Sequence, residues 1–374
     1  MKKLVTLTTL LLSSMVHAQS PKEIMYVGTY STRGSEGIYV LEFDRAKGTL
    51  TQIQTISNAK SPSFLAIHPT GQYLYSVNEA AANSGGVSSY AIEPKTGKLT
   101  MLNKESSHGR GPCHIAVDQT GKLAFVSNYG GGTFTVLPIK ADGSFGPATD
   151  TLKYEGKGPN AQRQEKPHIH SATVSPNNRF VYVCDLGTDK IYIYEFDLAT
   201  GKVKPAATPF ASVSPGSGPR HLAIHPNGKY LYAVEELTST VAVFALNSKT
   251  GALTLLQDNV KTLPDDFTDK NTSADIHTDP NGKFLYQSNR GYNALAMLSI
   301  ANDGKVTLLG QQPTEGKTPR NFLIDPKGEY VFAANQDTDN IVVYKLDNKT
   351  GKLTPTGTQV NVPSPVCLKL FTVK

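Results

Sequence analysis

Two short patterns of apolar and polar positions alternate along most of this chain. The first is a polar turn that contains glycine and leads into a β-prone run, as in KTGKLTML. Its seven copies have their glycines at Gly48, Gly97, Gly143, Gly201, Gly251, Gly304 and Gly351, about fifty residues apart. The second is a Pro, Asn or Gly turn followed by alternating aromatic and aliphatic residues, as in HPNGKYLYAVEE. This second pattern predicts a β-hairpin.

The hairpin pattern has six copies, one fewer than the glycine turn, and an apolar run precedes each copy. A seventh such run, SPVCLKL, stands alone near the C-terminus, while the first repeat begins at IMYVGTY without one. The last strand can therefore complete the first unit and close a ring, which removes two exposed sheet edges. We predict an all-β, seven-bladed β-propeller closed in this way. A linear solenoid would carry capping repeats and not complementary half-repeats.

The N-terminal segment has the layout of a secretory signal peptide. A basic start at Lys2 and Lys3 is followed by an apolar run and by the small-residue finish Val16-His17-Ala18. The apolar run is too short to span a bilayer. We predict cleavage after Ala18, leaving residues 19–374 as one propeller domain without a membrane span in the periplasm or outside the cell.

The composition and the absence of several motifs exclude some classes of function but do not identify one. The formal net charge of +6 is small and dispersed, so we expect no nucleic-acid partner. The cysteines Cys113, Cys184 and Cys367 lie in apolar runs without CxxC spacing, which favours buried thiols over a disulfide framework. No nucleophile elbow, P-loop, Rossmann glycine pattern or HExxH motif occurs. We expect no cofactor, no metal and a monomer.

Propeller topology predicts where chemistry gathers. In an up-and-down blade, the beginning of the first strand and the end of the second lie at the same rim. The side chains placed there are His114, His168, His170, Arg220, His221, Asp275, His277, Arg320 and Asn321 from first strands, and Glu79, Asn128, Asp185, Glu235, Glu236, Asn289, Arg290, Asn335 and Gln336 from second strands. Two long insertions, at 153–170 and 262–277, lead into first strands at this rim and suggest a binding face.

The residue types at this rim point to chemistry on a carbonyl. Two arginines, Arg220 and Arg290, can hold an anionic group and stabilise charge that develops on an oxygen. A histidine or glutamate nearby can take a proton from water. The recurring Asn128, Asn289 and Asn335 are better explained as architectural, because they repeat at equivalent positions. Lactone opening, or proton removal beside a carboxylate, fits this set.

Four segments carry a resemblance to the bacterial lactonase family of seven-bladed propellers, the 6-phosphogluconolactonase group. They are RQEKPHIH (163–170), GPRHLAIHPNGKYLYAVEEL (218–237), LPDDFTDKNTSADIHTDPNGKFLYQSNRG (263–291) and TPRNFLIDPKGEYVFAANQ (318–336). The related fungal carboxymuconate lactonizing enzymes have a pattern that is similar to IHS, GPRH, YLYAVEE and QSNR here. This resemblance implies that His170, Arg220, Glu236 and Arg290 are the catalytic residues.

The sequence therefore predicts an exported lactone hydrolase that opens an aldonolactone or 6-phosphogluconolactone with water. Arg220 and Arg290 would bind the substrate's oxygens, and either His170 or Glu236 would activate the water. Further substrate-binding residues are expected at His168, Asp185, His221, His277, Arg320 and Arg163. A muconate-type cycloisomerase and a non-catalytic propeller that binds carbohydrate or protein are the alternatives.

Overall fold

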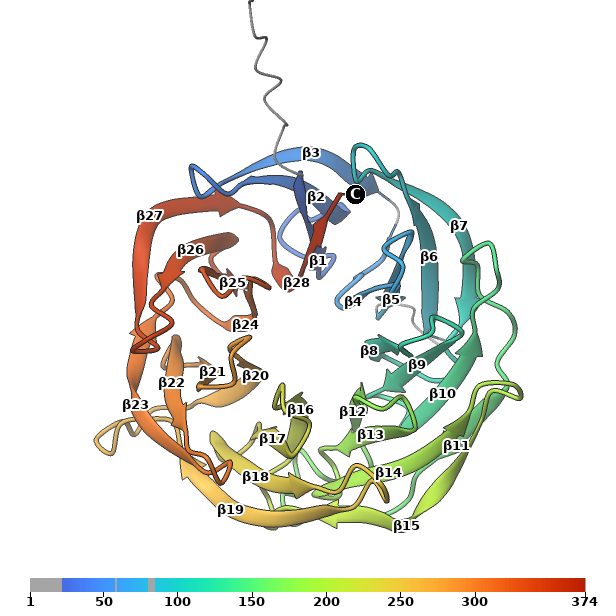
Figure 1. The fold of residues 1–374 in the computed structure, drawn as a ribbon. Helices are drawn as coiled ribbons and strands as arrows, with labels where there is room; N and C mark the ends of the chain where they lie inside the picture. The colour runs from blue at the N-terminus through green and yellow to red at the C-terminus, as the bar shows by residue number, and fades with distance from the viewer. Residues whose placement is uncertain (1–21, 58, 80–84, 374) are drawn as a thin grey trace, which may run out of the picture.

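The computed structural model describes residues 22–57, 59–79 and 85–373. Within these ranges the chain forms seven four-stranded antiparallel sheets and no helix. Figure 1 shows the sheets arranged around a central axis as the blades of a propeller. The predicted fold is confirmed, whereas the predicted signal peptide lies outside the described residues.

The strands are given blade by blade, from the axis outward. Blade 1 contains β28 (Pro365–Thr372), β1 (Glu23–Thr29), β2 (Gly37–Asp44) and β3 (Thr49–Ser57), and blade 2 contains β4 (Leu65–Ile67), β5 (Tyr73–Asn78), β6 (Gly86–Ile92) and β7 (Leu99–Ser106). Blade 3 contains β8 (Pro112–Val117), β9 (Leu123–Asn128), β10 (Thr133–Pro138) and β11 (Asp150–Lys153), and blade 4 contains β12 (Ile169–Val174), β13 (Phe180–Asp185), β14 (Lys190–Asp197) and β15 (Lys202–Ser212). Blade 5 contains β16 (Pro219–Ile224), β17 (Tyr230–Glu235), β18 (Thr240–Leu246) and β19 (Leu253–Lys261), and blade 6 contains β20 (Thr272–Thr278), β21 (Phe284–Arg290), β22 (Ala294–Ile300) and β23 (Val306–Pro313). Blade 7 contains β24 (Pro319–Ile324), β25 (Tyr330–Asn335), β26 (Asn340–Leu346) and β27 (Leu353–Asn361).

The ring closes through the C-terminal strand, as the repeat count predicts. Strand β28 pairs antiparallel with β1, with Glu23 opposite Thr372 and Val27 opposite Leu368. Both strands lie in the same blade in Figure 1, so the first and last strands that the structure describes share one sheet. This pairing leaves no inner strand unpartnered and ties the first blade to the last part of the chain.

The glycine turns and the hairpin aromatics, which are separate patterns in sequence, meet between neighbouring blades. The hydroxyl of Tyr182 on β13 donates to the carbonyl of Gly251 at 3.0 Å. Gly251 has φ +74°, and a Cβ atom there would lie 2.6 Å from Cδ1 of Phe180. Tyr286 bonds Gly351 in the same way in the next pair of blades. These two turns therefore require glycine both for their backbone conformation and for the close approach of a ring.

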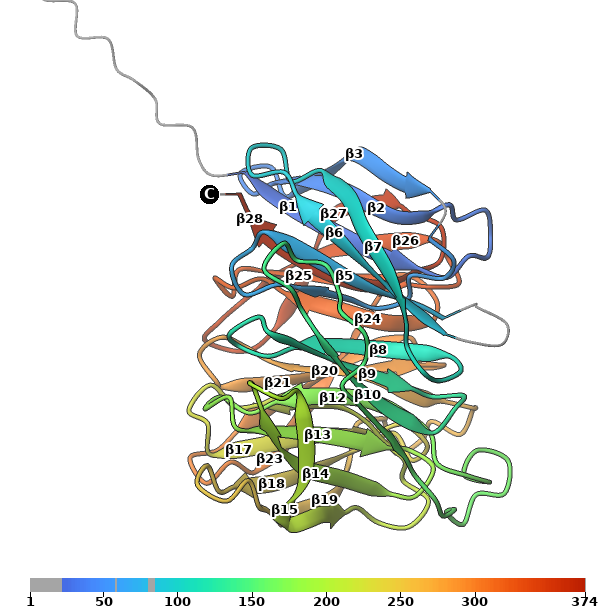
Figure 2. The same ribbon diagram turned by 90° about the vertical axis from the view of Figure 1, so that its right-hand side faces the viewer.

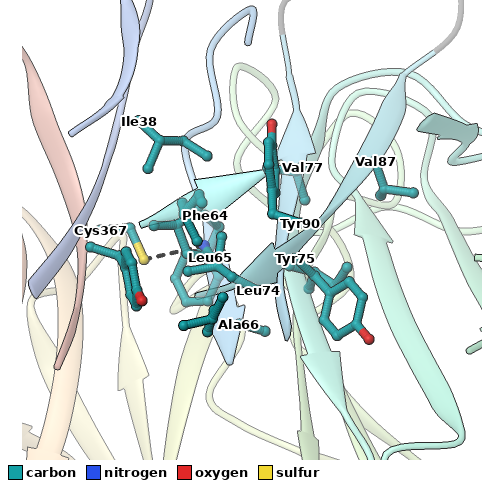
Figure 3. Close-up of a cluster of buried hydrophobic side chains, with 14 of the residues drawn as sticks. Ile38, Phe64, Leu65, Ala66, Leu74, Tyr75, Val77, Val87, Tyr90 and Cys367 are labelled. Atoms are coloured by element: carbon teal, nitrogen blue, oxygen red, sulfur yellow. Dashed lines mark hydrogen bonds between the residues drawn. The ribbon is translucent and has the colours of Figure 1, made fainter. Parts of the chain in front are cut away.

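The hydrophobic core lies between the blades and surrounds the axis. Figure 3 shows the part between the first blades, where Tyr75, Tyr90 and Leu74 are fully buried. There the backbone N–H of Leu65 donates to Sγ of Cys367 at 3.3 Å, so the closing strand also contacts the inner strand of blade 2. The three cysteines are free and buried, as predicted.

Figure 2 shows the propeller from its edge, with the connections between strands gathered on its two faces. These two faces are the rims on which a site can form, because the blades themselves are filled by side chains. A search of the described residues finds no helix long and apolar enough to cross a membrane.

Candidate active site

The inner strands bring reactive side chains to the channel mouth through a shared irregularity. Where β16 pairs with β17, Pro219 lies opposite Glu235 and His221 opposite Val234, so Arg220 is an extra, bulged residue. The same shift leaves Cys113, His170 and Arg320 as extra residues in blades 3, 4 and 7. A bulge re-aims the side chain of its extra residue. The side chains of these four residues therefore do not follow the regular alternation of sides along their strands.

The second strand of several blades also supplies a side chain to the site. In each case the residue is the last one of the strand or the one directly after it. Tyr30, Glu79, Tyr129 and Glu236 directly follow β1, β5, β9 and β17, while Arg290 is the last residue of β21. All of these except Tyr30, together with the bulged residues of blades 3, 4 and 7, line a cavity of about 260 Å³. Its lining is Glu79, Cys113, Tyr129, Arg163, His170, Glu236, Thr272, Arg290 and Arg320.

Glu236 is the carboxylate on which the cations converge. Its Oε1 atom accepts a hydrogen bond from Nη2 of Arg163 at 2.5 Å, and its Oε2 atom lies 2.9 Å from Nε of Arg220 and 3.1 Å from Nη2 of Arg290. Burial by itself raises the pKa of this carboxyl, but the three arginines outweigh burial and lower the pKa to about 2. Glu236 is therefore ionised near neutral pH and is a weak proton acceptor.

Positive charge exceeds negative charge around the cavity. The four guanidinium groups are those of Arg163, Arg220, Arg290 and Arg320, and the two carboxylates are those of Glu79 and Glu236. Burial lowers the pKa of Arg290 to about 9 despite the attraction of Glu236. The Nε atom of Arg290 is also buried without a hydrogen-bond partner among the described residues. A negative charge that entered the cavity would meet donors and unbalanced cations.

His170 lies next to this cluster in neutral form. Its Nε2 atom is 4.0 Å from Oε2 of Glu236, and its side chain is 5% exposed. Burial and then the charge of Arg220 lower its pKa well below the usual 6.5. The thiol of Cys113 donates to the backbone carbonyl of His170 at 3.2 Å. His170 therefore offers an unprotonated imidazole beside the cavity.

Arg320, which belongs to blade 7, also lines the cavity. Its guanidinium carbon lies 5.2 Å from the centre of the Tyr30 ring. No ion pair joins it to a carboxylate in the part of the chain that the structure describes, in contrast to Arg163, Arg220 and Arg290. Its donors therefore remain available to a bound molecule.

The predicted catalytic residues lie together in the structure. His170, Glu236 and Arg290 line the cavity, and Arg220 contacts Glu236 from behind it. Of the residues predicted to bind substrate, Arg163 and Arg320 also line the cavity. The catalytic and binding roles of all of these residues remain predictions.

Two other predicted binding residues lie behind the cavity wall. His168 stacks on Tyr129 with ring centres 4.4 Å apart, and its Nε2 atom is 3.1 Å from Glu165. The carboxylate of Asp185 accepts the backbone N–H groups of His168 and Gly187, at 2.7 and 2.9 Å. His168 supports a ring of the lining, and Asp185 holds the turn after β13, so neither lies among the lining residues.

His221 and His277 belong to a second cavity, of about 420 Å³, further along the channel. That cavity is lined by Phe64, Leu65, Ala66, Ile67, His114, Ile115, Ala116, Thr173, His221, Leu222, Asp275, Ile276, His277 and Lys369. The sequence places Arg220 and His221 at one rim, and their side chains do touch, but His221 lines this second cavity while Arg220 contacts Glu236. The single rim of the prediction is thus two groups of residues in the structure.

Sequence reasoning did not single out Tyr30, Tyr129 and Thr272. Tyr30 and Tyr129 occupy the same repeat position as Glu236, immediately after a second strand, in the segments VGTY and VSNY. Superposing the hairpin copies at that position would have identified both tyrosines. Thr272 opens β20 after a long insertion, where the repeat gives no register.

Across the three described ranges, no three His, Cys, Asp or Glu side chains are placed to hold a metal ion. The donor set of the cavity is guanidinium, imidazole, phenol and carboxylate groups. It suits an organic substrate with oxygen atoms that accept hydrogen bonds.

Comparisons with known proteins give a consistent picture over nearly the whole chain. Residues 24–370 match the family described as lactonase, 7-bladed beta-propeller. The chain is 38% identical to the 6-phosphogluconolactonase of Bacillus subtilis over 351 residues, which cover 94% of this chain and 99% of the relative. It is 35% identical to the 6-phosphogluconolactonase of Formosa agariphila, covering 93% of this chain and 99% of that one. The solved structure of the periplasmic gluconolactonase of Pseudomonas aeruginosa is similar, with TM-score 0.88, 31% identity and coverage of 94% and 100%.

Proposed function

The chain belongs to the family of seven-bladed β-propeller lactonases, and on that premise we propose that it is an exported lactone hydrolase acting on a single sugar-acid ring. The observation that carries the proposal is the cavity at the channel mouth. There, three arginines surround Glu236, and the neutral ring of His170 lies beside them. This combination provides both a proton acceptor and stabilisation for a developing anion.

The reaction begins with a water molecule that attacks the lactone carbonyl carbon. His170 accepts a proton from that water, and the carbonyl oxygen becomes an oxyanion. The oxyanion re-forms the carbonyl as the bond between the carbonyl carbon and the ring oxygen breaks, and the departing alkoxide takes the proton that His170 accepted and becomes a hydroxyl group. The product is a hydroxy acid that ionises and releases one proton near neutral pH.

Arg220 and Arg290 face the oxyanion in this proposal. The excess positive charge destabilises the empty cavity and is relieved when negative charge develops, so the arginines favour the transition state over the neutral lactone. The same negative charge opposes the effect of the arginines on His170 and raises its proton affinity. Glu236 is assigned to holding the arginines in place, because its low pKa makes it a poor base.

The size and charge of the cavity limit the substrate. A volume of about 260 Å³ lies below the range of roughly 300–1,000 Å³ that is usual for drug-sized ligands. It suits one monosaccharide lactone better than a lactone at the end of an oligosaccharide. Arg320, across the cavity from Glu236, is proposed to bind a polar or anionic substituent of that ring.

Export is proposed from the N-terminal sequence, and a periplasmic gluconolactonase among similar structures supports it. Cell fractionation with N-terminal sequencing of the mature protein tests it. Recovery from the periplasm with Gln19 as the first residue is expected. Recovery of the intact N-terminus in the cytoplasm would contradict it.

Acid release in a pH-stat tests the activity on gluconolactone and 6-phosphogluconolactone, each measured above its spontaneous hydrolysis. Saturable acid release with at least one of them is expected. Saturable binding without turnover on either compound would instead favour a carbohydrate-binding propeller, and turnover of a muconate alone would favour a cycloisomerase.

A further inference from the structure

Arg220 is held from the side opposite Glu236 by its own neighbour in sequence. The Nη1 atom of Arg220 lies 3.1 Å from Nε2 of His221 and also donates to the carbonyl of Ala274. A guanidinium group has only donors. The Nε2 atom of His221 must therefore accept this bond and carry no proton.

The other nitrogen of the His221 ring fixes which tautomer is present. Its Nδ1 atom lies 2.8 Å from Oδ1 of Asp275. Burial raises the pKa of Asp275, but His277 and His221 more than offset burial and hold the pKa well below its usual range. The ionised carboxylate can only accept, so the proton of a neutral His221 ring resides on Nδ1.

Asp275 is itself held firmly. Its Oδ2 atom accepts from Nε2 of His277 at 2.9 Å and from the side-chain amide of Asn321. Asn321 in turn accepts the backbone N–H of Leu368 on the closing strand at 2.7 Å. The carboxylate is thus anchored by inner strands of three blades, β20, β24 and β28.

We propose that Asp275 is a positioning residue for Arg220. Asp275 fixes His221 as the Nδ1–H tautomer, so Nε2 of His221 can accept a hydrogen bond from Arg220 and keep its guanidinium group against Glu236. This proposal rests on the proposed function, in which Arg220 faces the reacting oxygen. Asp275 and His221 line the second cavity and not the first, so they act through Arg220 and not on the substrate.

The orientation of the Arg220 guanidinium has to be fixed, because more than one set of contacts with its neighbours is open to it. Its side chain is 3% exposed, and Arg290 contacts the same carboxylate oxygen of Glu236. Without the second acceptor that His221 provides at Nη1, only the carbonyl of Ala274 holds that nitrogen, and the guanidinium could rotate toward a two-pronged contact with Glu236 and turn its donors away from the substrate. A displacement of about 1 Å at a reacting group costs on the order of 100-fold in rate.

Asp275→Asn changes the chemistry while keeping the shape. His277 and Asn321 both donate toward one side of the group, so the amide oxygen of the variant faces them and its NH₂ faces His221. The Nδ1 atom of His221 must then accept, which moves the ring proton to Nε2. That proton would meet the N–H of Arg220, donor against donor.

The first test is spectroscopic and independent of turnover. Long-range ¹⁵N–¹H correlation spectra of the mature protein, labelled with ¹⁵N-histidine, report which ring nitrogen carries the proton, and loss of one signal set in His221→Gln assigns His221. We expect a protonated Nδ1 in the wild-type protein and a protonated Nε2 in Asp275→Asn. A protonated Nε2 in the wild-type protein overturns the proposal, even if Asp275→Asn does not fold.

The second test is a kinetic double-mutant cycle. Asp275→Asn is expected to lower kcat about 10- to 100-fold with KM changed less than about 3-fold. Gln at position 221 keeps an acceptor near Nε2 but loses the link to Asp275, so in His221→Gln the same Asp275→Asn change should lower kcat less than about 3-fold. Equal losses in both backgrounds, or no loss in a folded Asp275→Asn, overturn the proposal.

Asp279→Asn provides the matched control. Asp279 is equally buried, but it accepts the backbone N–H groups of Lys283 and Phe284 in the turn after β20. This variant should lower the thermal midpoint without changing kcat or the His221 signals. If the wild-type protein turns over no lactone, the proposed function fails, while the tautomer spectra still decide whether Asp275 positions Arg220.

Discussion

Glu235 and Glu236 are adjacent in sequence and opposite in environment. The carboxylate of Glu236 faces the cavity and three arginines, whereas Oε2 of Glu235 accepts the hydroxyl of Thr240 at 2.5 Å inside blade 5. Burial raises the pKa of Glu235 to about 7, while the arginines hold that of Glu236 at about 2. Two neighbouring glutamates therefore provide a matched pair of variants, one in the proposed site and one beside it.

Glu236→Gln is predicted to abolish most activity, and Glu235→Gln to preserve it. Removing the charge of Glu236 leaves the largely buried Arg220 and Arg290 without the partner that they share with the partly exposed Arg163, which is expected to cost about 3–5 kcal/mol of stability and on the order of 100-fold in kcat/KM. Initial rates in the pH-stat and thermal melts measure both effects. Similar rates for the two variants would remove Glu236 from the site.

The contrast between these two glutamates also shows what the sequence could predict. The alternation of a β-strand indicates that consecutive residues point to different sides, and that inference is confirmed by the contact of Glu235 with Thr240. The same rule does not place Arg220, because Arg220 is an extra residue without a partner on β17. The bulge lies at the second residue of β16, so the pairing of the residues after it is regular and periodicity alone does not reveal it.

The fold was more predictable than the site for a related physical reason. Seven glycine turns and six hairpins determine the number of blades and the closing strand, and each is a local pattern. The contacts around Glu236 instead join blades 4, 5 and 6 across the channel, at sequence separations set by side-chain packing. The convergence of residues could be predicted, whereas the partner of each residue could not.

His170 is predicted to keep the enzyme active on the acid side of neutrality. Its pKa is lowered well below 6.5 by burial first and by nearby arginines second, so the neutral, proton-accepting form persists as the pH falls through 6.5. The acid limb of kcat/KM should therefore lie well below pH 6.5. A limb centred at 6.5 or above would contradict this assignment.

Replacing His170 tests the same group directly. His170→Asn should reduce kcat by about 100- to 10,000-fold, the usual contribution of a general base. The solvent-exposed His108, which is not among the residues that line the cavity, provides a control, and His108→Asn should leave kcat unchanged. Retained activity in His170→Asn would assign proton transfer to another group.

Arg320 is predicted to set the preference between phosphorylated and neutral lactones. It lines the cavity without an ion pair to any described carboxylate, so its donors can bind a phosphoryl group. Arg320→Met should raise KM for 6-phosphogluconolactone about tenfold and KM for gluconolactone by less. An equal rise for both compounds would show that Arg320 contacts a part of the ring that they share. Arg33→Met, at an exposed pair with Asp339, is the control and should change neither KM.

Glu235 is predicted to make stability fall as the pH rises. Its folded-state pKa of about 7 exceeds the ordinary 4.5, so the folded protein holds this proton more tightly than the unfolded chain. The resulting stability is fully present below pH 4.5 and is lost as the pH rises through 7, up to about 3 kcal/mol in total. Denaturant melts between pH 4.5 and 8 should show a decline in the wild-type protein that is smaller in Glu235→Gln. Parallel declines in both proteins would contradict the shift.

Gly251, in a repeated turn, and Gly357, inside β27, separate the two reasons for glycine at a position with positive φ. Both have positive φ, +74° and +80°, but an added Cβ would lie 2.6 Å from Phe180 at Gly251 and would meet nothing within 4 Å at Gly357. Alanine at either position costs about 1–2 kcal/mol for the left-handed backbone. Gly251→Ala should cost about 1–3 kcal/mol more, because the ring of Phe180 has to move. Equal losses in thermal melts would mean that backbone conformation alone accounts for the repeated glycine, and that the contact between neighbouring blades can relax without cost.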